Sequence, residues 1–253
     1  MEPERENPLI TDYINKHTVM GMLSANYVPF GDWSGFYRNK TRTKVTVFDP
    51  GFDGDFKETA FHYVPDRMGK GYSSTLLVSR FDSAFFALAG AEHKEIRETR
   101  NKWDRLVSVR EEPSSVGEVV ALVDKWDILS GSKYGFNRHS GYDRNFFRRY
   151  WETERSNLYS LFFYHGDALV GYSVVSKLQD DNCFRYVIRK MDIGAGRNIC
   201  LYIDYKTFES IWRDRKGCFY VNWGASSGKV LKYKEKFPTF KECRVWFHKK
   251  GGK

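Results

Sequence analysis

Hydrophobic and polar residues alternate at Lys44–Phe48, and a period of two is typical of a half-buried strand. Turn signals then separate further expected strands at Thr59–Val64, at Ser74–Val78, which is apolar enough for the centre of a sheet, and at Leu106–Val109. The segment Val28–Tyr37 is rich in glycine and aromatic residues without a period and is predicted to be a loop.

Two helices are predicted among these strands. One begins at Thr11, a good capping residue, and ends at Leu23. The other runs without a break from Ser83 to Trp103, where acidic and basic residues lie three or four positions apart as on a solvated helical face. The turn-forming run Pro113-Ser114-Ser115 then predicts a joint between two halves, residues 1–114 and 115–253.

The second half shows a clearer order of helices and strands. Its periodicity predicts two helices, three antiparallel strands, a helix, a strand, a helix and a last strand. The expected fold is therefore α/β, with a mixed, largely antiparallel sheet and flanking helices. The segments are, in order, the helix Val116–Trp126, the loop Ser130–Tyr142, the helix Asp143–Arg155, the strands Tyr159–Tyr164, Ala168–Ser176 and Cys183–Arg189, the helix from Gly194 to about Arg213, the strand Cys218–Asn222, the helix Gly228–Phe237 and the strand Arg244–His248.

Composition and charge indicate which partners the protein binds and in which compartment it works. The net charge is +9, which favours polyanionic partners such as nucleic acid or phosphorylated molecules. Four cysteines without a C-x-x-C pair make a metal site unexpected and indicate reduced thiols. The chain begins without an apolar signal segment and has no 18-residue apolar stretch, so we expect a cytoplasmic protein without a membrane span.

A run of cations and rings follows the first helix of the second half. Cations interleaved with aromatic residues suit a phosphate backbone beside a base-stacking surface, although an ordinary surface loop and an amphipathic helix give the same pattern. Within the run, His139 and Asp143 form a candidate base and its orienting carboxylate. The candidate nucleic-acid-binding residues are Lys133, Arg138, Tyr142, Arg144, Arg148 and Arg149.

A glycine-containing turn opens the helix that follows the third strand. Free N–H groups at a helix start can bind an anion, and glycine lets a phosphate approach. The candidate phosphate-binding residues are Arg189, Lys190, Gly194, Ala195, Gly196 and Arg197.

The element order of Val116–His248, together with this turn, resembles a domain of the GNAT acyltransferase superfamily. The resemblance implies a phosphorylated or pyrophosphate-bearing donor at the turn, either acyl-CoA or aminoacyl-tRNA. Where the family has Arg or Gln three residues before the first glycine, this chain has Met191, which weakens the case for CoA.

A second part of the resemblance concerns the reacting centre. Asn222 ends a strand, and Tyr233-Lys234-Glu235-Lys236-Phe237 follows on the next helix, similar to the family's Asn and Tyr-x-Lys pattern. The resemblance implies that Tyr233 protonates the leaving group and that Asn222 contacts the ligand. The glycine that the family has before the phenylalanine is missing, and both residues are also compatible with purely structural roles.

The whole chain is similar to Fem-type peptidoglycan aminoacyltransferases and lysyl-phosphatidylglycerol synthases, which carry two GNAT-like halves. These families move an amino acid from aminoacyl-tRNA to an amine or hydroxyl. GNAT-like bacteriophage proteins that modify DNA bases are a related resemblance, and the basic charge favours them. The favoured prediction is therefore a transferase that acts on a modified, phage-type DNA base. The alternatives are an aminoacyl-tRNA-dependent transferase acting on peptide or lipid amines, and a non-catalytic nucleic-acid-binding module.

Overall fold

The computed structural model describes the backbone of residues 27–29, 36–39, 45–47, 60–65, 72–134, 140–149, 151–177, 182–226 and 228–249, and the side chains of a smaller set within 77–239. The chain folds into two compact units. One contains Phe81–Tyr220, and the other contains Met1–Arg80 and Val221–Lys253. The division into GNAT-like halves at residue 114 stays a prediction.

The unit Phe81–Tyr220 is built on an antiparallel sheet in the spatial order β6-β7-β8-β9. A tight turn with Gly166 at φ +60° joins β7 to β8, as the turn signal His165-Gly166-Asp167 between two strand-like runs predicted. The strands are β6 (Ser108–Arg110), β7 (Leu158–His165), β8 (Ala168–Lys177) and β9 (Cys183–Met191), and β10 (Phe219–Ser226) begins in this unit.

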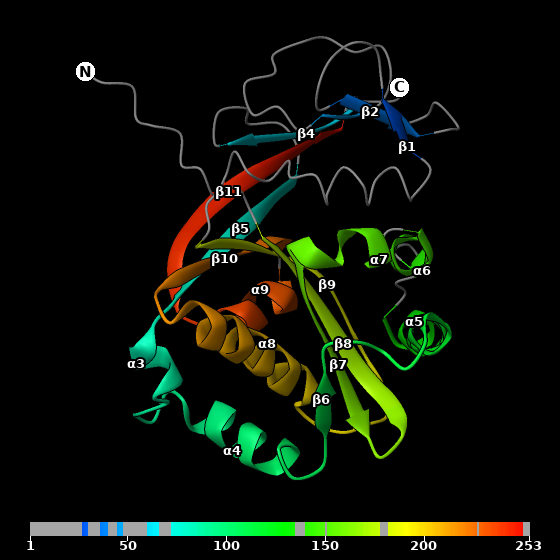
Figure 1. The fold of residues 1–253 in the computed structure, drawn as a ribbon. Coiled ribbons are helices and arrows are strands. Elements are labelled where there is room, and N and C mark those ends of the chain that lie inside the picture. Colours follow the sequence, from blue (N-terminus) through cyan, green and yellow to red (C-terminus); the bar gives the residue numbers. More distant parts are fainter. Residues whose placement is uncertain are drawn as a thin grey trace, which may run out of the picture. The chain divides into compact units, whose positions relative to one another are not determined.

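Helices cover both faces of this sheet (Figure 1). On one face, α5 and α6 bury Val119, Val123, Phe146 and Phe147 against the strands. On the other face, α4 and α8 pack Trp103, Ile199, Tyr202 and Ile203 against Leu161 and Phe163 of β7. The helices are α3 (Ser83–Phe86), α4 (Lys94–Trp103), α5 (Val116–Tyr134), α6 (Ser140–Arg149), α7 (Trp151–Glu154) and α8 (Ile199–Arg215), with a 3₁₀ turn, η1 (Arg155–Asn157), before β7.

The described residues of the second unit form further strands and the short helix α9 (Gly228–Lys234). β11 (Thr239–Lys249) lies between β4 (Ala60–Pro65) and β5 (Tyr72–Phe81) and is antiparallel to both, while β3 (Val45–Val47) is parallel to β4. Beyond β3, the sheet continues with β2 (Phe36–Asn39) and then β1 (Tyr27–Pro29). The helix α9 precedes β11 in the chain. The expected mixed, mainly antiparallel α/β architecture is confirmed.

Several local predictions were wrong. The predicted helix 83–103 is interrupted between α3 and α4, because Leu88 (φ +49°) and Gly90 (φ +86°) adopt left-handed conformations that a helix cannot contain. Part of the predicted loop 130–142 is helical, since α5 extends to Tyr134 and α6 begins at Ser140. Strands β1 and β2 overlap the two ends of the predicted loop 28–37, and the predicted helix 11–23 lies outside the described residues.

Candidate functional site

The loop from β9 to α8 is the candidate phosphate loop of the sequence, and an aspartate organises it. Asp192 accepts a hydrogen bond from the Gly194 N–H at 2.9 Å, and its other oxygen lies 2.5 Å from Lys125 Nζ of α5. Asn198, the residue before α8, is left-handed (φ +66°) and makes no side-chain cap. The beginning of α8 therefore keeps N–H groups that its own N-cap side chain does not satisfy.

Gly196 makes room for an indole ring. Its φ is +138°, and a Cβ atom added there would lie 3.2 Å from Cη2 and 3.3 Å from Cζ2 of Trp103. Trp103 comes from α4 and is 3% exposed. The missing side chain at this glycine thus serves the packing of α4 against the loop, rather than leaving open space for a phosphate.

Two carboxylates of α4 also face the beginning of α8. Asn198 donates a hydrogen bond from Nδ2 to Glu95 Oε1 at 3.3 Å. Glu95 and Glu98 line a surface pocket of about 310 Å³ together with Lys102, Arg197 and Asn198. The pocket therefore contains both charge signs at a place where the sequence led us to expect a purely cationic phosphate site.

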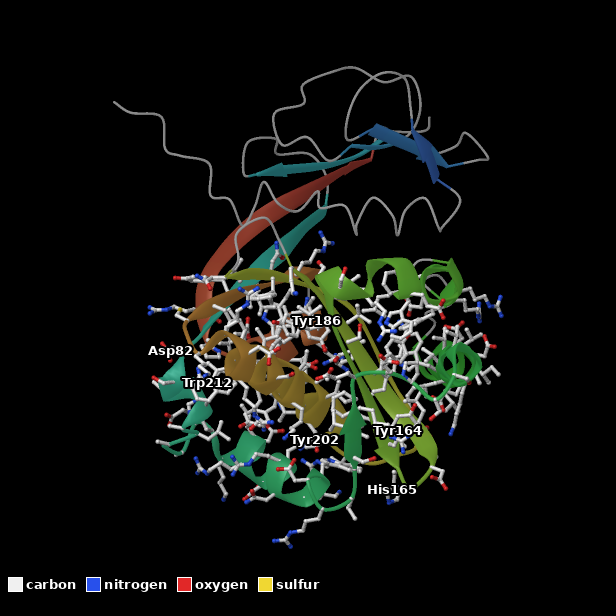
Figure 2. All side chains as sticks on the ribbon, viewed as in Figure 1. Asp82, Tyr164, His165, Tyr186, Tyr202 and Trp212 are labelled. Carbon is white, nitrogen blue, oxygen red and sulfur yellow. The ribbon has the colours of Figure 1, made fainter. Side chains whose placement is uncertain are left out.

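Arg189 is held by a buried carboxylate on one face of the sheet. Asp204 of α8 is fully buried and forms an ion pair with Arg189. Its other oxygen accepts a 2.6 Å hydrogen bond from Tyr186 of β9, and Figure 2 shows Tyr186 beside α8. Burial, and then the Asp204 carboxylate, raise the pKa of Tyr186 well above its usual value, so this phenol stays neutral.

Lys190, the next residue of β9, points to the opposite face. Its Nζ lies 2.9 Å from the Asp143 carboxylate of α6 and 4.1 Å from the centre of the Trp126 ring. Tyr172 of β8 is fully buried nearby, and burial together with the Asp143 charge raises its pKa well above the usual value. Two neighbouring candidate phosphate ligands are therefore separated by the sheet, and each pairs with a buried carboxylate.

The candidate nucleic-acid-binding residues are described only in part. Arg144 forms ion pairs with Asp124 and with Asp127, the latter at 2.8 Å, so two carboxylates of α5 offset its charge. Arg148 is exposed. The predicted base His139 and the predicted cation Arg138 lie outside the described residues, and the side chains of Lys133, Tyr142 and Arg149 are not described.

The two residues assigned to the reacting centre lie on consecutive elements of the second unit. Asn222 of β10 is fully buried. Tyr233 of α9 is half-buried, and its ring meets Phe237 edge-on at 6.2 Å. Phe237 in turn contacts Trp223, whose Nε1 donates to Ser79 at 2.8 Å. The ring of Tyr233 thus packs against Phe237, which packs against Trp223. The assignment of the Tyr233 phenol as a catalytic acid stays a prediction.

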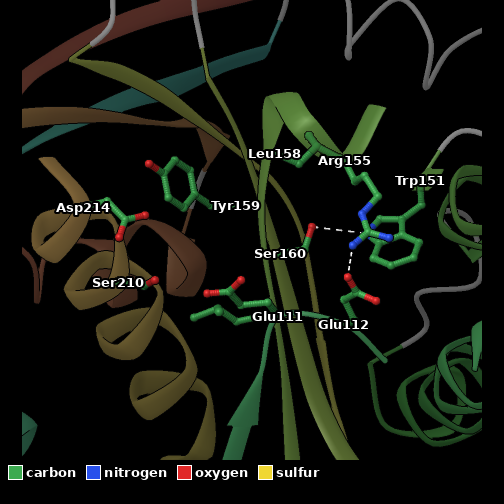
Figure 3. Close-up of a pocket in the computed structure, with 10 residues that line it drawn as sticks. Glu111, Glu112, Trp151, Arg155, Leu158, Tyr159, Ser160, Ser210 and Asp214 are labelled. Atoms are coloured by element: carbon green, nitrogen blue, oxygen red, sulfur yellow. Dashed lines mark hydrogen bonds and ion pairs between the residues drawn. The ribbon is translucent and has the colours of Figure 1, made fainter. Parts of the chain in front are cut away.

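A second pocket, of about 180 Å³, lies between β7 and the C-terminal half of α8 (Figure 3). Glu112 forms an ion pair with Arg155 on one side, where Trp151 Nε1 also donates to Ser160 at 3.3 Å. Tyr159 and Asp214 lie on the other side. Burial, and then Asp214, raise the pKa of Tyr159, so this pocket presents neutral hydroxyls and carboxylates that accept hydrogen bonds.

Neither a membrane-spanning helix nor a cluster of metal ligands occurs in the part of the chain that the structure describes. No described helix is long and apolar enough to cross a membrane. No group of three His, Cys, Asp or Glu side chains among the described residues could hold a metal ion. The side chains of Cys200 and Cys218 are described, and Cys200 is a free thiol.

Several solved structures share this fold. The structure of L-PGS from Bacillus licheniformis has a TM-score of 0.56 at 12% identity, over 86% of this chain and 81% of that one. The C-terminal domain of a putative lysylphosphatidylglycerol synthetase from Agrobacterium fabrum has a TM-score of 0.56 at 10% identity, over 96% and 90%. A tandem GNAT protein from the clavulanic acid biosynthesis pathway has a TM-score of 0.51 at 12% identity, over 86% and 78%.

No family model and no curated protein sequence matches the chain. The structural matches show a shared fold, and the GNAT-like fold expected from the sequence is confirmed. They extend across most of the chain rather than being confined to residues 115–253.

The sequence analysis did not identify the residues that contact the β9–α8 loop and its flanking cations. Asp204 is a carboxylate in an otherwise apolar stretch of α8, between Ile203 and Tyr205, and that pattern alone indicates a buried partner. Glu95 and Trp103 gave no such signal, because each lies far from the loop in the sequence (103 residues separate Glu95 from Asn198) and their helix reads as a solvated surface element.

Proposed function

We propose that this chain is a GNAT-fold transferase that moves an aminoacyl group from a carrier other than CoA onto an amine or hydroxyl. The observation that supports it best is the fold match over 96% of the chain to a domain named as a putative lysylphosphatidylglycerol synthetase. A match to L-PGS over 86% of the chain points the same way. The sequence resemblance to aminoacyl-tRNA-dependent families implies aminoacyl-tRNA as the donor.

The residues at the β9–α8 loop do not fit the diphosphate of CoA. Arg189 and Lys190 pair with buried carboxylates on opposite faces of the sheet, and Met191 stands where the family has a phosphate ligand. Glu95 lies against the residue that precedes α8. Like charges at close range disfavour a polyphosphate, so a carrier with less charge at this place is the better proposal.

The proposed reaction is an acyl transfer, in which the aminoacyl group moves from the carrier hydroxyl to the nitrogen or oxygen of the acceptor. The acceptor nitrogen or oxygen bonds to the aminoacyl carbonyl carbon, and the ester bond between that carbon and the carrier hydroxyl breaks. The acceptor loses a proton, and the departing carrier oxygen gains one. We assign the second proton transfer to Tyr233 and a ligand contact to Asn222, as the resemblance implies, and a phenol is a suitable acid for this step.

A DNA base as acceptor is the weaker proposal. Its support is the net charge of +9 and the exposed Arg148. Against it, Arg144 is engaged by Asp124 and Asp127. A non-catalytic nucleic-acid-binding module is a third possibility, which the presence or absence of turnover separates from both transferases.

The proposal is tested with a pool of tRNA charged with labelled amino acids. In three separate reactions, the chain and this pool are incubated with phosphatidylglycerol vesicles, with a mixture of peptide and small amines, or with duplex DNA. We expect enzyme-dependent label on the lipid or on the amines. Label on DNA alone would support the base-modifying alternative. No transfer beyond spontaneous ester hydrolysis, with any acceptor, would contradict a transferase that uses this donor.

A further inference from the structure

The strand β7 is longer than the strand that pairs with its outer edge. β6 is the last strand of the sheet order, and it pairs only with Phe162–Tyr164 of β7, whereas β8 pairs with β7 on the other side from Leu158 to His165. Among the described residues, no other strand pairs with the outer edge of Leu158–Leu161, and no loop bonds to its backbone. An unpaired edge of this kind presents N–H and C=O groups to which another chain can pair.

The pocket of about 180 Å³ follows this open edge. Its lining includes the consecutive residues Leu158, Tyr159, Ser160 and Leu161. Successive side chains of a strand point to opposite faces of the sheet. Leu158 belongs to the hydrophobic core on the side of α5 and α6, and Leu161 belongs to the core on the side of α8. Because the pocket reaches residues of both faces, it lies beside the backbone at the edge of the strand.

The two walls of this pocket differ in charge. Figure 3 shows Glu112 on the side of Arg155, with which it forms an ion pair, and Glu111 on the side of α8. Glu111 also lines a further pocket, of about 300 Å³, against α8. Asp214 of α8 lies on the same wall, and both it and Glu111 are exposed. Among the described side chains, no ion pair engages either of these two carboxylates.

An extended peptide with a basic side chain fits both features of this place. A strand added beside Leu158–Leu161 gains affinity from main-chain hydrogen bonds, and its alternate side chains enter the two walls and give specificity. A Lys or Arg side chain directed to the wall of α8 meets Glu111 and Asp214. The neighbouring side chains meet the other wall, where Arg155 already offsets the charge of Glu112, so uncharged residues suit them.

We propose that the open edge of β7 is a docking site for an extended basic segment of a partner protein, and that Glu111 and Asp214 select its cationic side chain. The inference goes beyond the proposed function and requires no turnover. Ser210 and Asp214, which line the pocket, lie near the C-terminal end of α8 (Ile199–Arg215), whereas the β9–α8 loop precedes its other end.

The test measures binding of a fluorescent, end-capped probe peptide, Val-Thr-Lys-Thr-Val, to the full chain. In an extended peptide the lysine and the valines share one face and the threonines share the other. We expect this probe to bind about fivefold or more tightly than the same peptide with glutamate in place of lysine. The net charge of the chain is +9, so non-specific attraction would favour the glutamate peptide instead.

Two N-methylated probes test whether the peptide pairs as a strand. Backbone N–H groups of alternate residues point to the same edge of a strand, so methylation of the two threonines blocks one edge and methylation of the lysine and the last valine blocks the other. One of the two methylated peptides should bind about tenfold or more weakly than the parent, because it loses hydrogen bonds to β7. Amide hydrogen exchange of Leu158–Leu161 should also slow when the parent peptide is added.

A charge variant and a matched control test the selecting residues. Glu111→Gln/Asp214→Asn removes both charges and should weaken binding of the lysine peptide about fivefold or more. Asp167→Asn/Glu235→Gln removes the same amount of charge from exposed residues that do not line the pocket, and it should leave binding unchanged. Thermal unfolding of each variant reports whether it is folded.

Each contrary result overturns a stated part of the inference. Equal affinity for the lysine and glutamate peptides, or equal losses in the two charge variants, would overturn selection by Glu111 and Asp214. Displacement of the probe by n-butylamine at a similar concentration, with no loss for either methylated peptide, would show a site for small cations and overturn strand pairing. Absence of binding by every peptide would show that the carboxylates only protect the edge and would overturn the docking site.

Discussion

The ammonium of Lys190 lies 2.9 Å from the carboxylate of Asp143, and the two side chains are only 11% and 4% exposed. They connect the end of β9 to α6 through the interior of the unit. Because removal of one partner leaves the other charge buried, we predict that Asp143→Asn and Lys190→Met each lower the free energy of unfolding by about 3 kcal/mol. Urea unfolding measures both values.

The double variant distinguishes a coupled pair from two unrelated defects. Asp143→Asn/Lys190→Met combines the two single changes and removes both charges together, so its loss of stability should be smaller than the sum of the single losses. Strictly additive losses would show that the two side chains act independently.

The contact between Gly196 and Trp103 predicts an intolerant glycine. At Gly196, alanine meets both a strained φ of +138° and an indole at 3.2 Å, so Gly196→Ala should destabilise by more than about 2 kcal/mol. Gly166 is the matched control, because it has φ +60° and nothing within 4 Å of an added Cβ. Gly166→Ala should lose about 1 kcal/mol. Equal losses in urea unfolding would mean that backbone strain alone matters.

Buried tyrosines predict loss of stability at high pH. Burial, and then Glu209, raise the pKa of Tyr205 to about 12 from an ordinary value of 10.0. The folded chain therefore holds this proton more tightly than the unfolded chain, so the contribution is full below pH 10 and is lost as pH rises through about 12. Unfolding measured between pH 9 and 12 should show the decline. Tyr205→Phe should make it shallower, and an unchanged slope would contradict the assignment.

The assignment of Tyr233 as an acid predicts a selective kinetic defect. Tyr233→Phe keeps the ring on Phe237 and removes the hydroxyl, so the transfer rate should fall on the order of 10²- to 10⁴-fold with little change in stability. Tyr159→Phe removes a hydroxyl from the pocket of Figure 3 and should leave the rate within a few-fold of wild type. Equal rates for wild type and Tyr233→Phe would remove Tyr233 from the mechanism.

The local parts of the fold could be predicted from sequence. The β7–β8 hairpin follows from two strand-like runs around a His-Gly-Asp turn. The helix predicted to open at Gly194 begins only at Ile199, because Gly196 and Asn198 have positive φ values that a helix cannot contain. The break between α3 and α4 was missed, although Gly90 marks it, because the apolar run Phe85–Ala89 and the charged run after it together resemble one helix.

The chemistry of the loop could not be predicted in the same way. Two adjacent cations, Arg189 and Lys190, read as one phosphate-binding pair, yet adjacent residues of a strand point to opposite faces. Asp204, Asp143 and Glu95 lie on helices α8, α6 and α4. Only the tertiary fold brings these carboxylates to Arg189, to Lys190 and to the start of α8. Spacing in the sequence therefore located the loop but not its charge balance.

The central claim, a GNAT-fold transferase whose donor is not CoA, is tested most directly by offering two donors at once. Radiocarbon-labelled aminoacyl-tRNA and tritium-labelled acetyl-CoA are supplied at equal concentration with the acceptor that the transfer assay identifies. The account predicts a product that carries radiocarbon and no tritium. A product that carries tritium would contradict it and would show that the β9–α8 loop accepts CoA in spite of Glu95 and Glu98.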